Sequence, residues 1–105
     1  MLVTMPAETH AVALVRAADA WDYRRPMGRQ RLIAEHLAYL RDLTGGGEVA
    51  IAGPVIHFDE SPEPGDLVGL VLYRTRVNRA RVLAGGDPTV VAGLVRCQVL
   101  PWYAG

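Results

Sequence analysis

The sequence predicts a single α+β domain in which strands and helices follow the order strand, helix, strand, strand, helix, strand. Its 105 residues suit one domain, and hydrophobic residues make up 50% of them, which is enough for a packed core. Short apolar runs alternate with two segments of helical spacing. Turns rich in glycine or proline separate these segments, so each element has a predictable end.

The first predicted strand is the apolar run HAVALVR at residues 10–16. Residues 1–9 have no basic start and no long apolar run, so we expect a flexible leader rather than a signal peptide. A connection follows at residues 17–26. It contains Trp21, which we expect to pack on the edge of the core, and it begins an arginine cluster that is either a solvated surface or an anion-binding site.

The long helix is predicted over residues 27–44. Leu32, His36 and Leu40 lie four residues apart, so at about 3.6 residues per turn they share one face. The glycine run at residues 45–47 ends the helix. A titratable ring therefore sits in the middle of an apolar stripe, where it is either a core group with a hydrogen-bond partner or part of a site.

A hairpin is predicted next. Residues 48–58 read as a strand that contains a break or bulge at Gly53–Pro54, and residues 59–66 read as a polar turn. The following strand, LVGLVLY at residues 67–73, is apolar on both faces. A sheet with helices on one side needs only one apolar face, so the other face predicts a second subunit as its cover.

The last elements are a helix at residues 75–84 with Thr75 as its N-cap, a short helical turn, and a strand at residues 94–100. Asp87 followed by Pro88 is a strong start signal for the short turn. With right-handed crossovers, this order gives the ferredoxin-like βαββαβ arrangement: a four-stranded antiparallel sheet with the two main helices on one face.

Composition excludes several kinds of chemistry. All eleven basic residues are arginine, so a Schiff-base lysine and a phosphate-binding lysine of the P-loop type are impossible. Ser61 is the only serine and lies in a proline-rich turn, which argues against a serine nucleophile. Eleven acidic residues cancel the charge, so we expect neither nucleic acid nor a membrane as a partner.

Cys97 is the only cysteine, so neither an intrachain disulfide nor a cysteine zinc cluster can form. This composition fits a reducing cytoplasm, and we expect the side chain to serve in packing. A metal site made from His36, His57 and an acid is conceivable, but no ligand spacing supports it. We therefore expect neither a metal nor another cofactor.

Several short motifs, taken in order, resemble the YCII-related proteins, which are small dimeric α+β-barrel domains. The motifs are EHLAYLRDL, AGPV, GDLVGLVLY, GDP, AGLV and VLPW, and the lead-in WDYRRPMGRQ is similar to that of one branch of the family. The resemblance runs from about His10 to Trp102. It implies a fold like that of muconolactone-isomerase-like and antibiotic-biosynthesis-monooxygenase-like domains, and a homodimer formed through the sheet face.

The resemblance also implies a site, a histidine–aspartate pair in the cleft between helices and sheet. By position these residues are His36 and Asp87. Taken alone, His36 would be a core residue bonded to a backbone carbonyl or to Tyr73, and Asp87 would be a helix cap. The family commonly has an aromatic residue after Asp-Pro, where this sequence has Thr89, so this pocket wall is expected to be more polar or roomier.

The resemblance implies lyase-like or dehydrochlorinase-like steps on ring compounds. We expect a small-molecule enzyme of the lyase, isomerase or dehydrochlorinase type, in which His36 is the base and Asp87 orients it on a cyclic or enolic metabolite. Two alternatives stay open: a non-catalytic dimeric module that binds a ligand or partner, and a monooxygenase without haem or flavin. Expected substrate contacts are Arg16, Trp21, Arg24, Tyr39, Gly53, Pro54 and Tyr73, with Arg25 and Arg74 as further candidates for a polar anchor.

Overall fold

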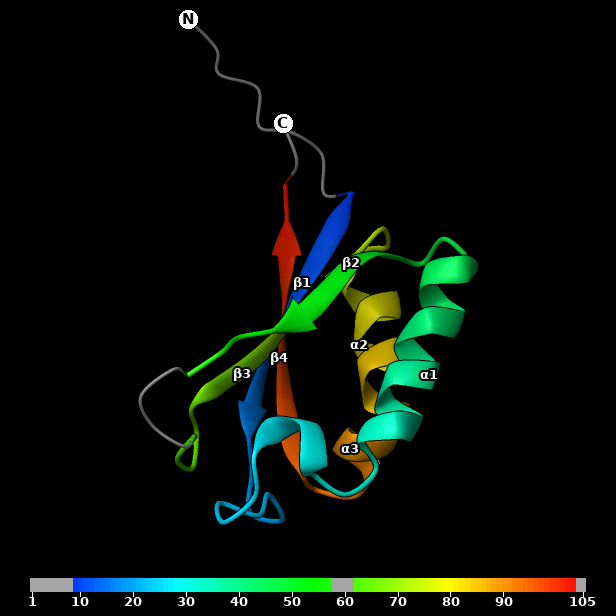
Figure 1. Cartoon of the computed structure of the whole chain (residues 1–105). Coiled ribbons are helices and arrows are strands. Elements are labelled where there is room, and N and C mark those ends of the chain that lie inside the picture. The colour runs from blue at the N-terminus through cyan, green and yellow to red at the C-terminus, as the bar shows by residue number, and fades with distance from the viewer. Residues whose placement is uncertain (1–8, 58–61, 104–105) are drawn as a thin grey trace, which may run out of the picture.

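The computed structural model describes residues 9–57 and 62–103. All helices pack on one face of a four-stranded antiparallel sheet whose strand order is β2-β3-β1-β4 (Figure 1). This confirms the predicted ferredoxin-like fold. The elements are β1 (His10–Ala17), the 3-10 helix η1 (Met27–Arg29), α1 (Ile33–Gly45), β2 (Val49–Pro54), β3 (Leu67–Tyr73), α2 (Val77–Gly85), α3 (Pro88–Val91) and β4 (Val95–Trp102).

The core lies between the sheet and α2. Alternate residues of β1 are buried, and three of them are alanines: Ala11, Ala13 and Ala17. Small side chains on a central strand let a helix approach the sheet closely. Helix α2 fills that space with Ala80 and Leu83, packing over β1 and β4.

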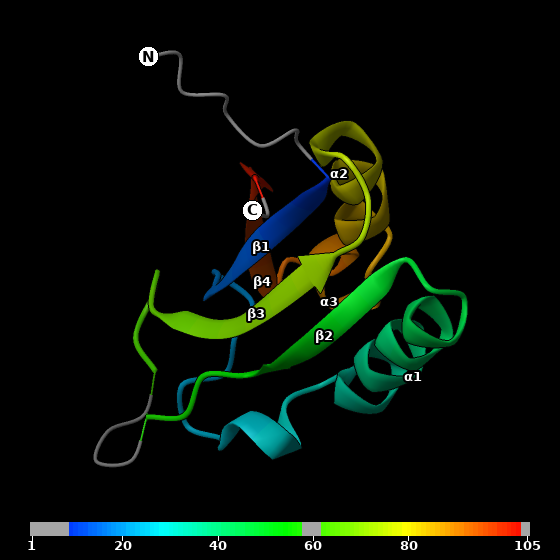
Figure 2. The ribbon, with the colours of Figure 1, turned by 90° about the horizontal axis from the view of Figure 1, so that it is seen from above.

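Helix α1 has a different position. It packs against the edge strand β2 and against α3 instead of lying over the middle of the sheet (Figure 2). None of its residues is buried, although Leu40 and Leu43 contact the core. The apolar face of α1 therefore looks toward the sheet without closing on it.

The predicted long helix is wrong at its start. Residues 27–29 form the short η1, and α1 begins only at Ile33, because Leu32 between them adopts a left-handed conformation with φ 66° and ψ 14°. An L-residue other than glycine pays an energetic penalty there, so the surrounding structure must hold it. The predicted end is close to the observed one, with Gly47 at φ 83° after the last turn.

Three other boundaries differ. Strand β2 ends at Pro54, which has no N–H to donate, and its irregularity lies between Val49 and Ile51 instead of at Gly53–Pro54. Helix α2 begins at Val77, while Thr75 donates a hydrogen bond to the carbonyl of Arg76 and so does not cap the helix. Strand β4 continues through Trp102. Residues 1–8 of the predicted leader at 1–9, the last residue of the predicted strand at 48–58 and residues 59–61 of the predicted polar turn at 59–66 lie outside the described residues.

In the described parts of the chain, the outer face of the sheet carries no helix (Figures 1 and 2). Leu14 pairs with Leu70 across β1 and β3, and Val12 pairs with Leu72 on one side and with Leu100 on the other. Directly paired residues share a face, so these side chains form one apolar surface. Leu70 is 41% exposed and Leu100 38%. Within the described residues, no helix is long and apolar enough to cross a membrane.

Candidate functional site

A cavity of about 590 Å³ lies between α1 and the sheet. Strands β2 and β3 supply its floor, including Gly53, Pro54 and Val71, and α1 supplies one wall. Trp21, from the segment before η1, supplies another part of the lining. Some lining residues, among them Arg31, are exposed, so the cavity opens to solvent.

His36 lines this cavity and touches Asp87. Its Nδ1 lies 2.6 Å from Oδ2 of Asp87, and the two side chains are 19% and 8% exposed. The histidine belongs to α1 and the aspartate is the N-cap of α3. The packing of α1 on α3 therefore brings together the two residues that the family resemblance pairs.

The second oxygen of Asp87 is held by Thr89. Oδ1 accepts a hydrogen bond of 2.9 Å from the Thr89 backbone N–H and one of 2.6 Å from the Thr89 hydroxyl. Capping and orientation of the histidine thus use different oxygens of one carboxylate. Burial opposes the charged form, but the hydrogen bonds from His36 and Thr89 hold the pKa of Asp87 below its usual value.

These contacts fix the tautomer of the His36 ring. An ionised carboxylate can only accept hydrogen bonds, so Nδ1 of His36 is the donor. In the neutral ring the lone pair is then on Nε2, which has no hydrogen-bond partner among the described residues. A ring with Nδ1 held by a carboxylate and Nε2 free is a suitable general base for a ligand in the cavity.

Thr89 takes the place at which the family resemblance leads us to expect an aromatic residue. It is 4% exposed, lines the cavity, and its hydroxyl lies 3.5 Å from Nδ1 of His36. The expectation of a more polar wall therefore has a physical basis, since this hydroxyl bonds to Asp87. The sequence indicates the contact between Thr89 and Asp87. In a capped helix the backbone N–H at position N2 donates to the side chain of the N-cap, and Thr89 is at N2 after the predicted cap Asp87.

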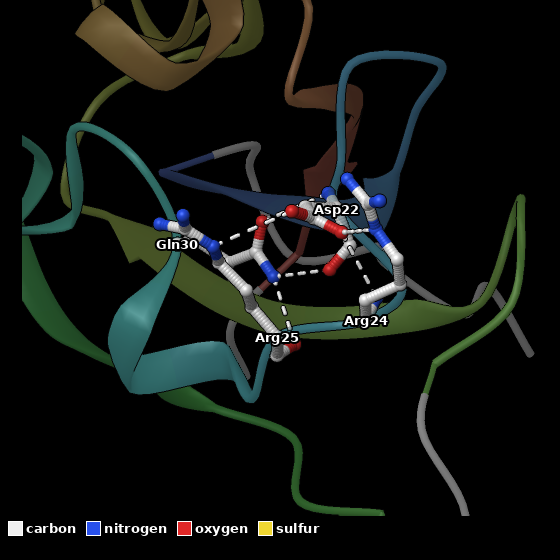
Figure 3. A network of polar contacts seen from close by, with 4 residues as sticks. All are labelled: Asp22, Arg24, Arg25 and Gln30. Carbon is white, nitrogen blue, oxygen red and sulfur yellow. Dashed lines mark hydrogen bonds and ion pairs between the residues drawn. The ribbon is translucent and has the colours of Figure 1, made fainter.

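Gln30 was not predicted, yet it organises the segment that carries Trp21. It is 4% exposed, and its amide lies between Asp22 and Arg25 (Figure 3). Its Nε2 donates to the carbonyls of Asp22 (2.7 Å) and Arg25 (2.9 Å), while its Oε1 accepts from the Asp22 N–H (3.0 Å). Three hydrogen bonds from one side chain to backbone groups leave no periodic pattern in the sequence, so the role of Gln30 could not be predicted.

Asp22 also neutralises the start of the predicted arginine cluster. Its carboxylate accepts hydrogen bonds from the backbone N–H and the side chain of Arg24, and it pairs with Arg25 at 3.4 Å (Figure 3). The bonds from Arg24 lower the pKa of the Asp22 carboxyl. Arg24 and Arg25 therefore hold the connection together, and neither lines the cavity.

Only some of the expected substrate contacts line the cavity. Trp21, Gly53 and Pro54 line the cavity. Arg16 does not; its Nη1 donates to the carbonyl of Gly65 at 3.3 Å. Arg74 is exposed and also lies outside the lining.

The two expected tyrosines also lie outside the cavity lining. Tyr39 donates a hydrogen bond of 2.7 Å to the carbonyl of Leu83, so it joins α1 to α2. Tyr73 is 2% exposed in the core, where burial raises the pKa of its hydroxyl. His36, for which Tyr73 was an alternative partner, makes its hydrogen bond to Asp87 instead.

The remaining candidate groups do not form a second site. His57 donates from Nε2 to the carbonyl of Leu67 at 2.7 Å. Burial raises the pKa of the Cys97 thiol to about 11, so it stays protonated at neutral pH. Across residues 9–57 and 62–103, no three histidine, cysteine or acidic side chains are grouped so that they could hold a metal ion.

Comparison with solved structures supports the fold. The chain is similar to the 5-chloro-2-hydroxyhydroquinone dehydrochlorinase TftG from Burkholderia phenoliruptrix AC1100, solved in complex with 2,5-dihydroxybenzoquinone. The TM-score is 0.65 at 18% identity, and the match covers 91% of this chain and 95% of the other. No curated protein matches the sequence significantly. Residues 1–103 match the YCII-related domain, and the chain belongs to this family.

Proposed function

We propose that this protein is a small-molecule enzyme that performs acid–base chemistry on a cyclic or enolic metabolite, with His36 as the base and Asp87 as the group that orients it. The observation that carries the proposal is the 2.6 Å contact between His36 Nδ1 and Asp87 Oδ2 at the wall of a solvent-connected cavity. The free Nε2 is then the atom that meets the substrate.

The proposed chemistry begins with proton transfer to His36 Nε2 from a carbon next to a carbonyl, or from a ring hydroxyl. The resulting imidazolium is stabilised by the Asp87 carboxylate, whose place is fixed by Thr89. Return of the proton to another atom gives an isomerisation. Departure of a leaving group with its electron pair gives an elimination, and neither outcome needs a protein nucleophile.

Two further observations support a ring-shaped substrate. A cavity of about 590 Å³ with a mostly apolar lining is of the size that holds a small organic molecule. The structurally similar dehydrochlorinase was solved with a dihydroxybenzoquinone, a ring compound bearing carbonyl and hydroxyl groups. At 18% identity this likeness does not give the substrate of the present chain.

The test follows the exchange of carbon-bound hydrogen for deuterium in D₂O by NMR, on a panel of ring ketones and enols that includes 5-chloro-2-hydroxyhydroquinone. We expect at least one compound to react or exchange with the wild type. We expect His36→Gln to slow it about 100-fold or more, because general-base catalysis typically contributes that much. If wild type and His36→Gln are equal on every compound, the acid–base proposal is wrong.

The second candidate is a non-catalytic dimeric module, and the apolar outer face of the sheet favours its dimer component. We propose a homodimer through this face in either case, since Leu14, Leu70 and Leu100 would otherwise stay in water. A module that only binds would need no free Nε2 beside the cavity, which is why we place the enzyme first.

Location in the cytoplasm stays a proposal from the single cysteine.

A further inference from the structure

The charge of the cavity lining has one sign. Among the described residues of the lining, the fixed charges are those of Arg31 and Arg41, and none of these residues is an aspartate or glutamate. The whole chain has as many acidic as basic residues, so this is a local property of the cavity and not of the composition. The Asp87 carboxylate, which contacts His36, is not part of the described lining and is already bonded to His36 and Thr89.

Both arginines are free of ion pairs with described residues. Other arginines near acids are neutralised: Arg24 and Arg25 by Asp22, and Arg79 by Glu48. The two at the cavity are exposed, one just before α1 and one inside it. Their guanidinium groups are therefore available to a carboxylate or phenolate, which they can bind through two hydrogen bonds at once.

Trp21 forms another wall of the cavity, and its side chain is 6% exposed. Its Nε1–H is buried and has no hydrogen-bond partner within the described parts of the chain. A nitrogen that a water-sized probe cannot reach from the cavity cannot donate to a ligand there. Trp21 therefore contributes aromatic surface to the site and no donor.

The rest of the lining limits the shape of that ligand. Leucine, isoleucine and valine side chains make up much of the wall, for example Ile33, Leu40 and Val71. Such a surface favours an apolar body over a sugar or a phosphate ester, because polar groups placed against it would lose their hydrogen bonds. The ligand should therefore be anionic at one side and apolar over the rest.

We propose that the cavity binds a ring compound that carries an anionic oxygen, a carboxylate or a phenolate, with Arg31 and Arg41 as its charge partners. This inference rests on the proposed function, since it names the substrate class of the same site. Binding of the anion does not need the base, however, so the two can fail separately.

The experiment is a titration of the full-length ¹⁵N-labelled protein with benzoate and, as an uncharged partner of the same shape, benzamide. Affinity is read from NMR shift changes of the residues that line the cavity. We expect benzoate to bind at least about tenfold more tightly than benzamide, since a charge-assisted hydrogen bond contributes about that much. Added salt should weaken benzoate and leave benzamide unchanged.

Variants assign the effect. The double change Arg31→Gln/Arg41→Gln should remove the preference for benzoate, and the single changes divide it between the two arginines. The matched control is Arg74→Gln/Arg81→Gln, which removes the same charge at two exposed arginines outside the lining and should keep the preference.

The inference is overturned if benzoate binds no more tightly than benzamide. It is also overturned if Arg31→Gln/Arg41→Gln keeps the preference for benzoate, or if Arg74→Gln/Arg81→Gln loses it. It is also overturned if the shifts map outside the cavity or neither compound binds at about 10 mM, a concentration above the weakest useful affinity. His36→Gln should still bind benzoate, so a failed exchange assay and a failed anion site give different results.

Discussion

At the scale of single residues, the site depends on how one carboxylate divides its two oxygens. Oδ1 of Asp87 caps α3 through Thr89, and Oδ2 holds the ring of His36. Because the capping bonds fix the carboxylate plane, they also fix the acceptor that holds the ring. The cap and the His36–Asp87 pair therefore stabilise each other, and changes at Thr89 should alter the orientation of the His36 ring.

The pKa of Asp87 gives a prediction for acid stability. It is lower in the folded protein than the usual 3.8, so the carboxylate form favours folding. This contribution is complete above the unfolded-state value and is lost as the pH falls through the lower folded value. We expect the wild-type free energy of unfolding, measured by urea denaturation, to fall more steeply between about pH 5 and pH 2 than that of Asp87→Asn.

Thr89→Val provides the graded control for this prediction. It removes the hydroxyl donor to Asp87 and keeps the backbone donor and the side-chain shape. Its acid-dependent loss should lie between those of wild type and Asp87→Asn, and Thr89→Ser should behave as wild type. Equal slopes for wild type and Asp87→Asn would show that the carboxyl has the same pKa folded and unfolded.

At the scale of elements, the position of His36 depends on how α1 is attached. The helix has no buried residue, so its attachment comes from few contacts. One of them is the hydroxyl of Tyr39, which donates to the carbonyl of Leu83 near the end of α2. Beside it, Gly86 leaves room: a Cβ built there would lie 2.6 Å from that hydroxyl oxygen. A side chain at Gly86 would have to displace Tyr39.

This contact predicts coupling between Tyr39 and Gly86. Tyr39→Phe should cost about 1 kcal/mol, the usual net value of one hydrogen bond. Gly86→Ala in the wild type should cost about 1–3 kcal/mol, because the new methyl group overpacks the contact while its φ of −88° suits alanine. In the Tyr39→Phe background the nearest atom recedes to 3.4 Å, so the alanine should cost much less there. Urea denaturation of the four proteins gives the coupling energy.

Additive costs in that cycle would mean that Tyr39 and Gly86 act independently. The methyl group would then make only ordinary contact, for example with the Leu83 carbonyl oxygen 3.6 Å away. Gly85→Ala is the matched control, since a Cβ there meets nothing within 4 Å. It should be neutral or stabilising, as alanine favours a helix more than glycine does.

The elements also show what the sequence can predict and where it stops. Periodicity and capping signals predicted seven of the elements, all except η1, and residues 67–73 agree with β3 to the residue. They could not predict that η1 and α1 are separate, because the left-handed conformation of Leu32 and the bonds of the Gln30 side chain to backbone groups five and eight residues away leave no periodic pattern. Likewise, Arg31 belongs to the predicted arginine cluster, for which the sequence left a solvated surface and an anion-binding site open, and Arg41 was not singled out. Arg16 and Arg24 were expected at the site instead, since side-chain partners decide which arginines remain free.

At the scale of the whole molecule, the sheet has two apolar faces and helices for only one. The inner face buries the core and the cavity, while the outer face leaves Leu70, Leu100 and their neighbours partly exposed. A stable dimer buries about 800 Å² on each partner, which is of the order of one face of a small sheet. A second copy packed on the outer face would leave the mouth between α1 and β2 on the other side of the sheet.

We therefore expect the wild type to be a dimer by size-exclusion chromatography with light scattering at micromolar concentration. Leu100→Glu should give a monomer, because a charge on the outer face would be buried without a partner in the dimer. Val82→Glu is the matched control: Val82 is 64% exposed on α2, so the same charge there should leave the dimer intact. The Leu100→Glu monomer should keep the His36–Asp87 pair, since that pair belongs to one chain. A monomeric wild type would contradict the dimer. A dimer that Val82→Glu breaks and Leu100→Glu does not would show that the contact lies elsewhere than on the outer face.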